Sequence, residues 1–229
     1  MSIAAFSAIP GLVHGFEQRS SETDAEARAS SRSRVARALE DRGRLLLMKQ
    51  VHGGTVVEAP WEATPEADAA LTLSPEYLLG VETADCLPIL LVDPRRRAVA
   101  AVHAGWRGTA KGVARHAIEA LTARGSRPDE LRAAIGPGIG PCCYEVGDEL
   151  RGVFGPEGEE FFLPGRNGRP HLDVRAANVR QLLHAGVRPD ALFHVQDCTC
   201  CRADLYHSYR RDGEGGGRMI SFVGFDPGC

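Results

Sequence analysis

The sequence of 229 residues lacks the marks of several protein classes. With 27 basic and 30 acidic residues the net charge is −3, so bulk electrostatics predicts neither a nucleic-acid partner nor a membrane surface. No apolar run approaches the roughly 20 residues that a membrane-spanning helix needs. Residues 1–10 lack the basic start of a secretory signal, and the seven cysteines, an odd number, are typical of reduced thiols. We therefore expect a cytoplasmic protein without a disulfide framework.

Signs of division or assembly are also missing from the chain. It contains no Pro/Ser-rich linker, no evident internal repeat and no long heptad pattern. Hydrophobic residues make up 43% of the sequence, which is ample for a packed core at this length. We expect a single domain over residues 1–229, and a monomer by default.

Short apolar runs bounded by glycine, proline or charge predict buried strands. The predicted strands are 45–49, 55–58, 77–81, 87–92, 98–102, 131–135, 192–195 and 218–225. One helix is expected from about Thr109 to Arg124, where apolar residues recur every three or four positions before Gly125. Another is expected from Asp173, a capping residue, to Gly186. Several strands between helices favour an α/β fold of mixed β-sheets packed with helices.

Three segments beside predicted strands each carry one side chain of a type that binds zinc: His52, Cys86 and His103. Zn²⁺ accepts imidazole and thiolate ligands, and three protein ligands leave a fourth tetrahedral position for water or substrate. The residues lie 34 and 17 positions apart, so they would have to meet through the fold. Taken singly, such a cysteine is usually a buried apolar residue, and such a histidine is usually hydrogen-bonded in the core. Together they predict a catalytic metal site.

Five blocks of the sequence resemble the signature segments of the YfiH-like, laccase-domain family. They are Gln50–Gly53, Ala84–Pro88, His103–Gly108, Gly136–Val146 and Ser208–Arg211. Several unusual segments in one order make this resemblance specific, and it extends over about three quarters of the chain, from Lys49 to Arg218.

The resemblance implies a fold, a metal and an activity. Members of the family were first labelled polyphenol oxidases and are now described as zinc-dependent purine nucleoside phosphorylases with adenosine deaminase activity. The implied fold is similar to the catalytic domain of deamidating necrotizing toxins. Position by position, His52, Cys86 and His103 match the family's metal ligands, one Zn²⁺ per chain. The implied partners are phosphate and a purine nucleoside: adenosine, inosine, guanosine or methylthioadenosine.

The N-terminal part departs from the family pattern. Family members usually carry an Asn- and Gly-containing loop and an Asn-Arg pair between the first strand and the first helix. Residues 18–39 are shorter here and rich in Ala, Arg and Ser. If the usual loop contacts substrate, Arg19 and Arg34 are the candidates to replace it.

Charged neighbours of the three segments are candidates for catalysis. Deamination needs a carboxylate that passes a proton to the departing ammonia, and Asp85 is the first candidate, with Glu82 the second. Adjacent strand residues point to opposite faces, so Asp85 could equally be a hydrogen-bond partner that orients the site. Arg107 could hold phosphate with its planar fork while Trp106 shapes the pocket, or it could pair with a structural carboxylate.

Five other cysteines raise the question of a second metal: Cys142, Cys143, Cys198, Cys200 and Cys201. We interpret them as adjacent and alternate cysteines that lack the Cys-x-x-Cys loop of a structural zinc site, which leaves a second zinc site as the minor alternative. On that interpretation they are buried free thiols.

Other functions stay open from the sequence. A metal-free hydrolase would use Cys86 as nucleophile and His103 as its base, and it would have no obvious need for His52. A copper polyphenol oxidase would require a larger histidine set, and the eight scattered histidines show no His-x-His pattern, so copper would be adventitious. A metal-stabilised module that binds nucleosides without turnover is the non-enzymatic alternative.

Overall fold

The structure is a computed structural model that describes every residue except 20–23, 166–167 and 229, and only the backbone of 24–30. The helices of the described residues are α1 Ala4–Ser7, α2 Asp24–Ala38, α3 Trp106–Ala110, α4 Val113–Ala123, α5 Glu149–Phe154, α6 Val174–His184 and α7 Tyr209–Asp212. The strands are β1 Leu12–Phe16, β2 Arg44–Leu47, β3 Val56–Glu58, β4 Ala69–Thr72, β5 Tyr77–Thr83, β6 Leu87–Asp93, β7 Ala98–Ala104, β8 Arg132–Ile135, β9 Phe162–Pro164, β10 Pro170–Leu172, β11 Leu192–His194 and β12 Met219–Phe225. No helix among the described residues is long and apolar enough to cross a membrane.

A six-stranded mixed sheet lies at the centre, in the order β11-β8-β6-β7-β4-β3. Its middle strands β6 and β7 are antiparallel, whereas the outer pairs β8/β11 and β3/β4 are parallel. All seven residues of β6 and all seven of β7 are buried. Continuous apolar runs suit strands that are covered on both faces, which is why these two strands could be predicted from composition.

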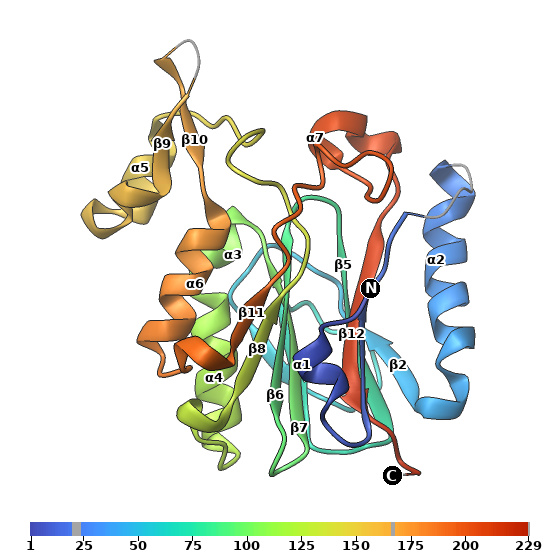
Figure 1. Cartoon of the computed structure of the whole chain (residues 1–229). Helices are drawn as coiled ribbons and strands as arrows, with labels where there is room; N and C mark the ends of the chain where they lie inside the picture. Colours follow the sequence, from blue (N-terminus) through green and yellow to red (C-terminus); the bar gives the residue numbers. More distant parts are fainter. Residues whose placement is uncertain (20–23, 166–167, 229) are drawn as a thin grey trace.

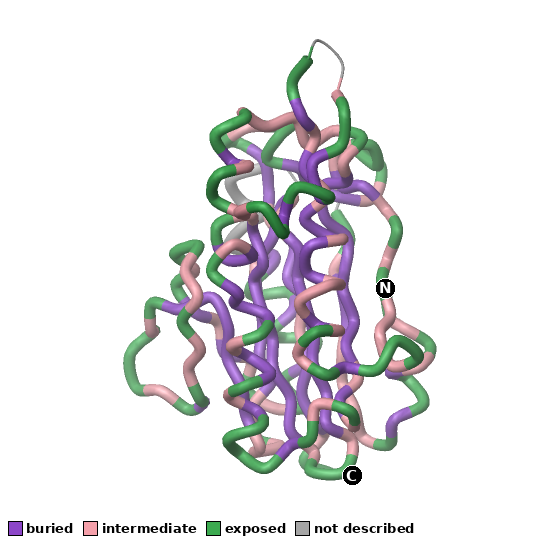
Figure 2. Tube along the Cα trace, turned by 90° about the vertical axis from the view of Figure 1, so that its left-hand side faces the viewer, coloured by how far each residue is buried: buried purple, intermediate pink, exposed green. Residues whose placement is uncertain are grey.

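The central sheet is covered by helices on one face and by a second sheet on the other (Figure 1). Helices α3, α4 and α6 pack on the first face. One hydrophobic cluster there joins Ile118 of α4 to Leu91 of β6 and Val102 of β7. The four-stranded sheet β1-β12-β5-β2 packs on the other face in a second cluster. On its outer side α2 contributes Val35 to a third cluster with Leu78. Figure 2 shows the resulting buried interior along the strands.

The fold class predicted from the sequence is confirmed, with one helix differing in detail. The single helix expected from Thr109 to Arg124 is two helices, α3 and α4, separated at Lys111 and Gly112. Gly112 has φ 76°, a left-handed conformation that favours glycine and ends the first helix. This break leaves α3 as a short helix at the end of β7, next to the candidate site.

Candidate metal centre and active site

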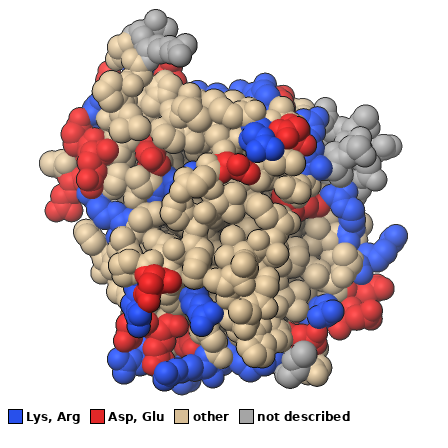
Figure 3. Space-filling view, viewed as in Figure 1, with Lys and Arg blue, Asp and Glu red and all other residues tan. Residues whose placement is uncertain are grey.

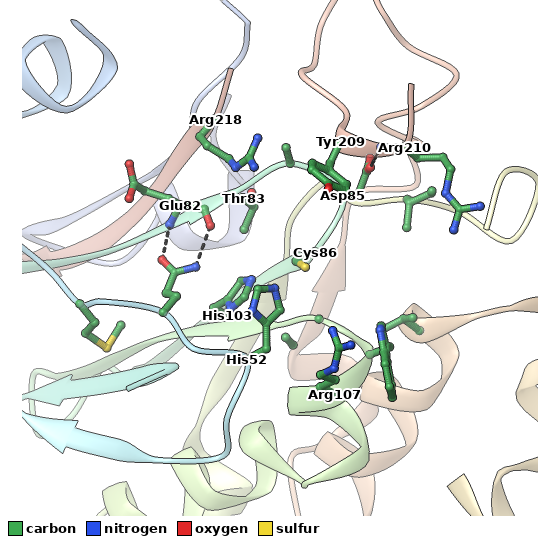
Figure 4. Close-up of a pocket in the computed structure, with 18 of the residues that line it drawn as sticks. His52, Glu82, Thr83, Asp85, Cys86, His103, Arg107, Tyr209, Arg210 and Arg218 are labelled. Atoms are coloured by element: carbon green, nitrogen blue, oxygen red, sulfur yellow. Dashed lines mark hydrogen bonds between the residues drawn. The ribbon is translucent and has the colours of Figure 1, made fainter. Parts of the chain in front are cut away.

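His52, Cys86 and His103 come together at one end of the central sheet. His52 lies in the loop after β2, Cys86 in the turn between β5 and β6, and His103 near the end of β7. Their ligand atoms all lie within 4.8 Å of one another, and the two imidazole rings are 4.9 Å apart at their centroids. Figure 4 shows the three side chains converging from separate segments of the chain. The structure thus groups the three residues proposed as ligands from the sequence.

A buried carboxylate, Asp68, holds this arrangement in place. One oxygen lies 2.8 Å from Nδ1 of His103 and accepts a 2.9 Å hydrogen bond from the backbone N–H of His52. The other oxygen accepts from the N–H groups of Val51 and Gly53. Because Nδ1 of His103 is engaged, its Nε2 is free to face the common centre. Sequence reasoning missed Asp68, although an acidic residue directly before an Ala-Ala-Leu run is a recognisable signal.

Two backbone features bring the three side chains close. His52 has φ 57°, an uncommon conformation that the Asp68 hydrogen bonds stabilise. Gly105 passes directly beside the thiol: a Cβ built there would lie 2.8 Å from Sγ of Cys86 and 3.3 Å from Cδ2 of His52. The short approach between loop and sulfur therefore requires glycine at this position.

The thiol and the inner imidazole form an ion pair in the protein alone. Burial would raise the pKa of Cys86, but the imidazoles of His103 and His52 lower it to about 6. Burial would lower the pKa of His103, but the Cys86 thiolate and the Asp68 carboxylate raise it to about 9. The sulfur is therefore a thiolate at neutral pH, the form that binds metals and acts as a nucleophile.

The three residues border a cavity of about 1090 Å³. Its walls come from segments far apart in the sequence, including Arg32, Trp106, Tyr144 and Tyr209. A cavity of this size accommodates a small organic molecule. Figure 3 shows charged side chains of both signs around largely uncharged surface on one face of the molecule, in keeping with the small net charge.

Arg107 borders the cavity and has an exposed guanidinium. The group stacks on the ring of Trp106 at 4.4 Å from the centroid. Within the described part of the chain it forms no ion pair within 4.0 Å. The pairing with a structural carboxylate that the sequence left open is therefore not formed in the described structure, and the guanidinium can receive an anion.

The two acidic candidates also border the cavity, and both are engaged. Asp85 accepts 2.6 Å hydrogen bonds from the hydroxyl of Thr199 and the backbone N–H of Arg210. Glu82 accepts two hydrogen bonds from Arg32, one of them 2.7 Å long. The backbone of Glu82 also exchanges two 2.8 Å hydrogen bonds with the side chain of Gln50, drawn as dashed lines in Figure 4. The hydrogen bonds of the two carboxylates thus connect the chain segments that surround His52, Cys86 and His103.

The N-terminal residues suggested from the sequence lie elsewhere. Arg34 pairs with Glu17, and Arg19 donates to the carbonyl of Ala203, so neither borders the cavity. Arg32 and Ser33, next to Arg34 in the sequence, border it instead. The position of each arginine around helix α2 decides whether its side chain faces the cavity. This position could not be read from the sequence, because residues 18–39 depart from the family pattern.

Fold and site together define an α/β protein with a His-Cys-His group that could hold a metal ion, beside a cavity of about 1090 Å³. The model of the family described as multi-copper polyphenol oxidoreductase laccase matches residues 14–226. The chain belongs to this YfiH-like, laccase-domain family.

Similar proteins include several with functional names. A purine nucleoside phosphorylase of Deinococcus radiodurans is 40% identical over 200 residues, which cover 86% of this chain and 76% of that protein. Adenosine deaminase RL5, from an unknown prokaryotic organism, is 40% identical over 162 residues, 68% of this chain and 61% of its own length. The crystal structure of YlmD from Geobacillus stearothermophilus superimposes with a TM-score of 0.84 at 31% identity, covering 95% of this chain and 93% of that one.

Proposed function

We propose that the protein is a zinc-dependent purine nucleoside phosphorylase that also deaminates adenosine. The observation that carries the proposal is the grouping of the His52, Cys86 and His103 ligand atoms within 4.8 Å beside the cavity. The printed names of the similar proteins support both activities. Candidate substrates are adenosine, inosine, guanosine and methylthioadenosine, with phosphate as the second substrate. We further propose that the enzyme is cytoplasmic and monomeric.

The donor set fits zinc. Two imidazoles and one thiolate match zinc's preferences, and the Asp68 contact leaves Nε2 of His103 to face the ion. When bound, Zn²⁺ would supply a Lewis acid that makes water a nucleophile near neutral pH. The family description names copper, yet this centre offers three ligands where multicopper oxidation needs more, so we propose that copper binding is adventitious.

Arg107 is our candidate for holding phosphate. In phosphorolysis a phosphate oxygen bonds to C1′ of the ribose as the bond from C1′ to the purine breaks, so the phosphate must be held against the sugar. The exposed guanidinium, kept against Trp106, can donate two parallel N–H hydrogen bonds to two phosphate oxygens. Arg107→Ala should therefore raise the KM for phosphate more than the KM for adenosine in the phosphate-free reaction.

Asp85 is our candidate for a positioning residue in the deaminase activity, in place of the proton-shuttle role that the sequence also allowed. Both carboxylate oxygens already accept hydrogen bonds, from Thr199 and from the backbone of Arg210. These bonds hold the turn that carries Cys86 against the start of α7. We propose that Asp85 fixes the thiolate's position while deamination adds water at C6 of adenine and releases ammonia.

Metal analysis and product chromatography test the proposal together. Purified protein should hold about one zinc at this centre, convert adenosine to inosine without phosphate, and form adenine when phosphate is added. His103→Ala should lose the zinc and both reactions, whereas His184→Ala, which alters an exposed histidine at the end of α6, should keep them. Undiminished turnover in protein without zinc would contradict the proposal.

The ion pair between Cys86 and His103 specifically favours one other function, a metal-free cysteine hydrolase. His52 separates the two functions, because a cysteine–histidine pair does not need a second imidazole. His52→Ala should abolish zinc binding and turnover in the metalloenzyme. A hydrolase would keep its activity in this variant. A thiol alkylator would abolish that activity even when zinc is added, because no metal would protect Cys86.

A further inference from the structure

Four cysteines outside the candidate active site form a second cluster. Cys142 and Cys143 follow β8, and Cys198 and Cys201 follow β11. Their sulfur atoms all lie within 4.8 Å of one another, and none of the described cysteines forms a disulfide. The expectation of buried free thiols is therefore wrong about burial, since Cys142 and Cys201 are exposed, whereas the thiols are free as expected. Cys198 and Cys201 do have the Cys-x-x-Cys spacing, which the intervening Cys200 obscured.

The sulfur separations suit one tetrahedral ion. Zinc–sulfur bonds of about 2.3 Å place the corners of a tetrahedron about 3.8 Å apart. The sulfur of Cys201 is 3.6 Å from that of Cys142 and 3.3 Å from that of Cys143. Small side-chain rotations would bring these distances to the tetrahedral value. Four thiolates would fill every position, as in structural zinc sites.

Backbone contacts orient one sulfur toward this centre. The N–H of Gly140 donates a 3.2 Å hydrogen bond to Sγ of Cys198. A Cβ on Gly140 would lie 3.3 Å from Cβ of Cys198, so glycine lets the first loop pass close to the second. N–H donors stabilise a thiolate, which is the form that binds zinc.

A buried arginine supplies positive charge next to the cluster. Arg175 is 9% exposed and donates to the carbonyl of Asp197, the residue before Cys198. Its Nε has no hydrogen-bond partner among the described residues, and its charge interacts with Cys198 and Cys142. Four thiolates and one Zn²⁺ carry a net charge of −2, which a neighbouring guanidinium partly balances.

The cluster joins two loops that also border the cavity. The first loop contributes Ile139 and Tyr144 to its wall, and the second continues to Tyr209 at the start of α7. Thr199, between two of the cysteines, donates to the carboxylate of Asp85. A link between these loops would therefore fix one wall of the proposed active site.

We propose that Cys142, Cys143, Cys198 and Cys201 bind a second Zn²⁺, in a closed structural site that fastens the two loops together. This site is distinct in its residues from the proposed catalytic centre. Its existence does not depend on the proposed activity, because the four thiols bind metal whatever reaction the cavity supports.

Metal binding in a protein lacking the first centre tests this proposal. The double variant His52→Ala/His103→Ala should retain about one zinc per chain, with four sulfur neighbours near 2.3 Å by X-ray absorption. Replacing that zinc with Co²⁺ should give intense thiolate-to-metal absorption in the near ultraviolet and visible bands typical of a tetrahedral ion. Adding Cys201→Ser should lower zinc retention at least tenfold, whereas adding Cys200→Ser, next in the chain but outside the cluster, should leave it unchanged.

Several results would overturn the proposal. One is a double variant that folds, as judged by circular dichroism, but binds no zinc under reducing conditions. Another is a double variant whose zinc has fewer than three sulfur neighbours by X-ray absorption. Equal zinc retention in the Cys200→Ser and Cys201→Ser proteins would also overturn it. If Cys201→Ser does not fold, Cys142→Ser replaces it, and the X-ray absorption result on the double variant decides the question by itself.

Discussion

The two thiol-containing clusters of this protein are built from similar residue types but differ in the number of candidate ligands and in their surroundings. The first has three ligands of two kinds around a cavity, held by one buried carboxylate. The second has four sulfurs from two loops and lies near the surface, with Cys142 and Cys201 exposed. Three ligands leave room for a reacting molecule, whereas four close the coordination sphere. The comparison teaches that two features, more than the type of ligand, separate a catalytic metal centre from a structural one. They are the number of protein ligands and the groups, such as Asp68, that hold those ligands in place.

The two clusters also differ in the pKa values of their thiols. The imidazoles beside Cys86 overcome its burial and lower its pKa to about 6. Burial and neighbouring thiols raise the pKa of Cys142 to about 12. The first sulfur is therefore charged by the protein's own groups, while the thiol of Cys142 would need a bound cation to ionise near neutral pH.

The strongest contrast should come from adding one methyl group to each cluster. Gly105→Ala places a Cβ 2.8 Å from Sγ of Cys86, so we expect turnover to fall roughly 100-fold, as for other displacements of about 1 Å. Its φ of −73° suits alanine, so the contact alone causes the loss. Gly140→Ala places a Cβ 3.2 Å from Sγ of Cys142, a side chain that can move, and should change turnover less than about threefold. Steady-state kinetics of both variants with adenosine measures the difference, and equal losses would break the comparison.

The carboxylate that orients the first cluster gives the next effect. Asp68→Asn keeps the shape but removes the charge beside His103, so zinc affinity at the first centre should fall about 10- to 100-fold. Glu66→Gln is the matched control, because Glu66 pairs on the surface with Lys49. Competition with a chromophoric chelator measures both affinities. An unchanged affinity in Asp68→Asn would show that His103 is oriented by other contacts.

Thiol reactivity should separate the clusters by pH in metal-free protein. Since the thiolate is the reactive form and the pKa of Cys86 is about 6, its alkylation should be near maximal at pH 7. Below pH 6 the thiolate takes up a proton, and the rate should fall about tenfold per pH unit. Cys142, with a pKa of about 12, should react much more slowly at pH 7. Peptide mapping after timed iodoacetamide treatment measures both rates, and a Cys86 rate still rising between pH 7 and 9 would contradict this assignment.

The smallest effect on turnover should accompany loss of the second cluster. Cys201→Ser should change kcat less than about threefold, because Cys201 does not border the cavity and the hydrogen bonds from Thr199 and Arg210 to Asp85 still hold the wall. If zinc is present at 1,000 times its dissociation constant, its loss removes about 4 kcal/mol of stability. At this chain length that lowers Tm by roughly 10 °C. Differential scanning calorimetry alongside Cys200→Ser checks this, and equal Tm values in the two variants would contradict it.

Much of the architecture could be predicted from local pattern. The fully apolar runs of β6 and β7 predicted buried central strands, and Asp173 marked the start of α6, where its side chain accepts from the N–H of Ala176. Shorter or less apolar elements were missed, such as β4 and the β9–β10 hairpin. Length alone does not explain these misses, because β3, β8 and β11 are equally short and were predicted. Strand β4 begins with two alanines, and β9 and β10 each contain a proline, residue types that are depleted in strands.

The candidate site divides in the same way. Ligand chemistry selected His52, Cys86 and His103 from the sequence, because few residue types bind zinc. Asp68, Arg32 and the partners of Asp85 escaped notice, since carboxylates and arginines are common and only spatial neighbours distinguish them.

The sequence by itself determined the class of fold, through the lengths and composition of its apolar runs, and the chemical identity of the three grouped donors. Only the tertiary structure decided which side chains face one another. It brought Asp68 under His103, turned Arg32 rather than Arg34 toward the cavity, and collected four cysteines from two distant loops. The physical reason is that residue type and spacing fix local conformation, whereas proximity between loops depends on how the sheets and helices pack.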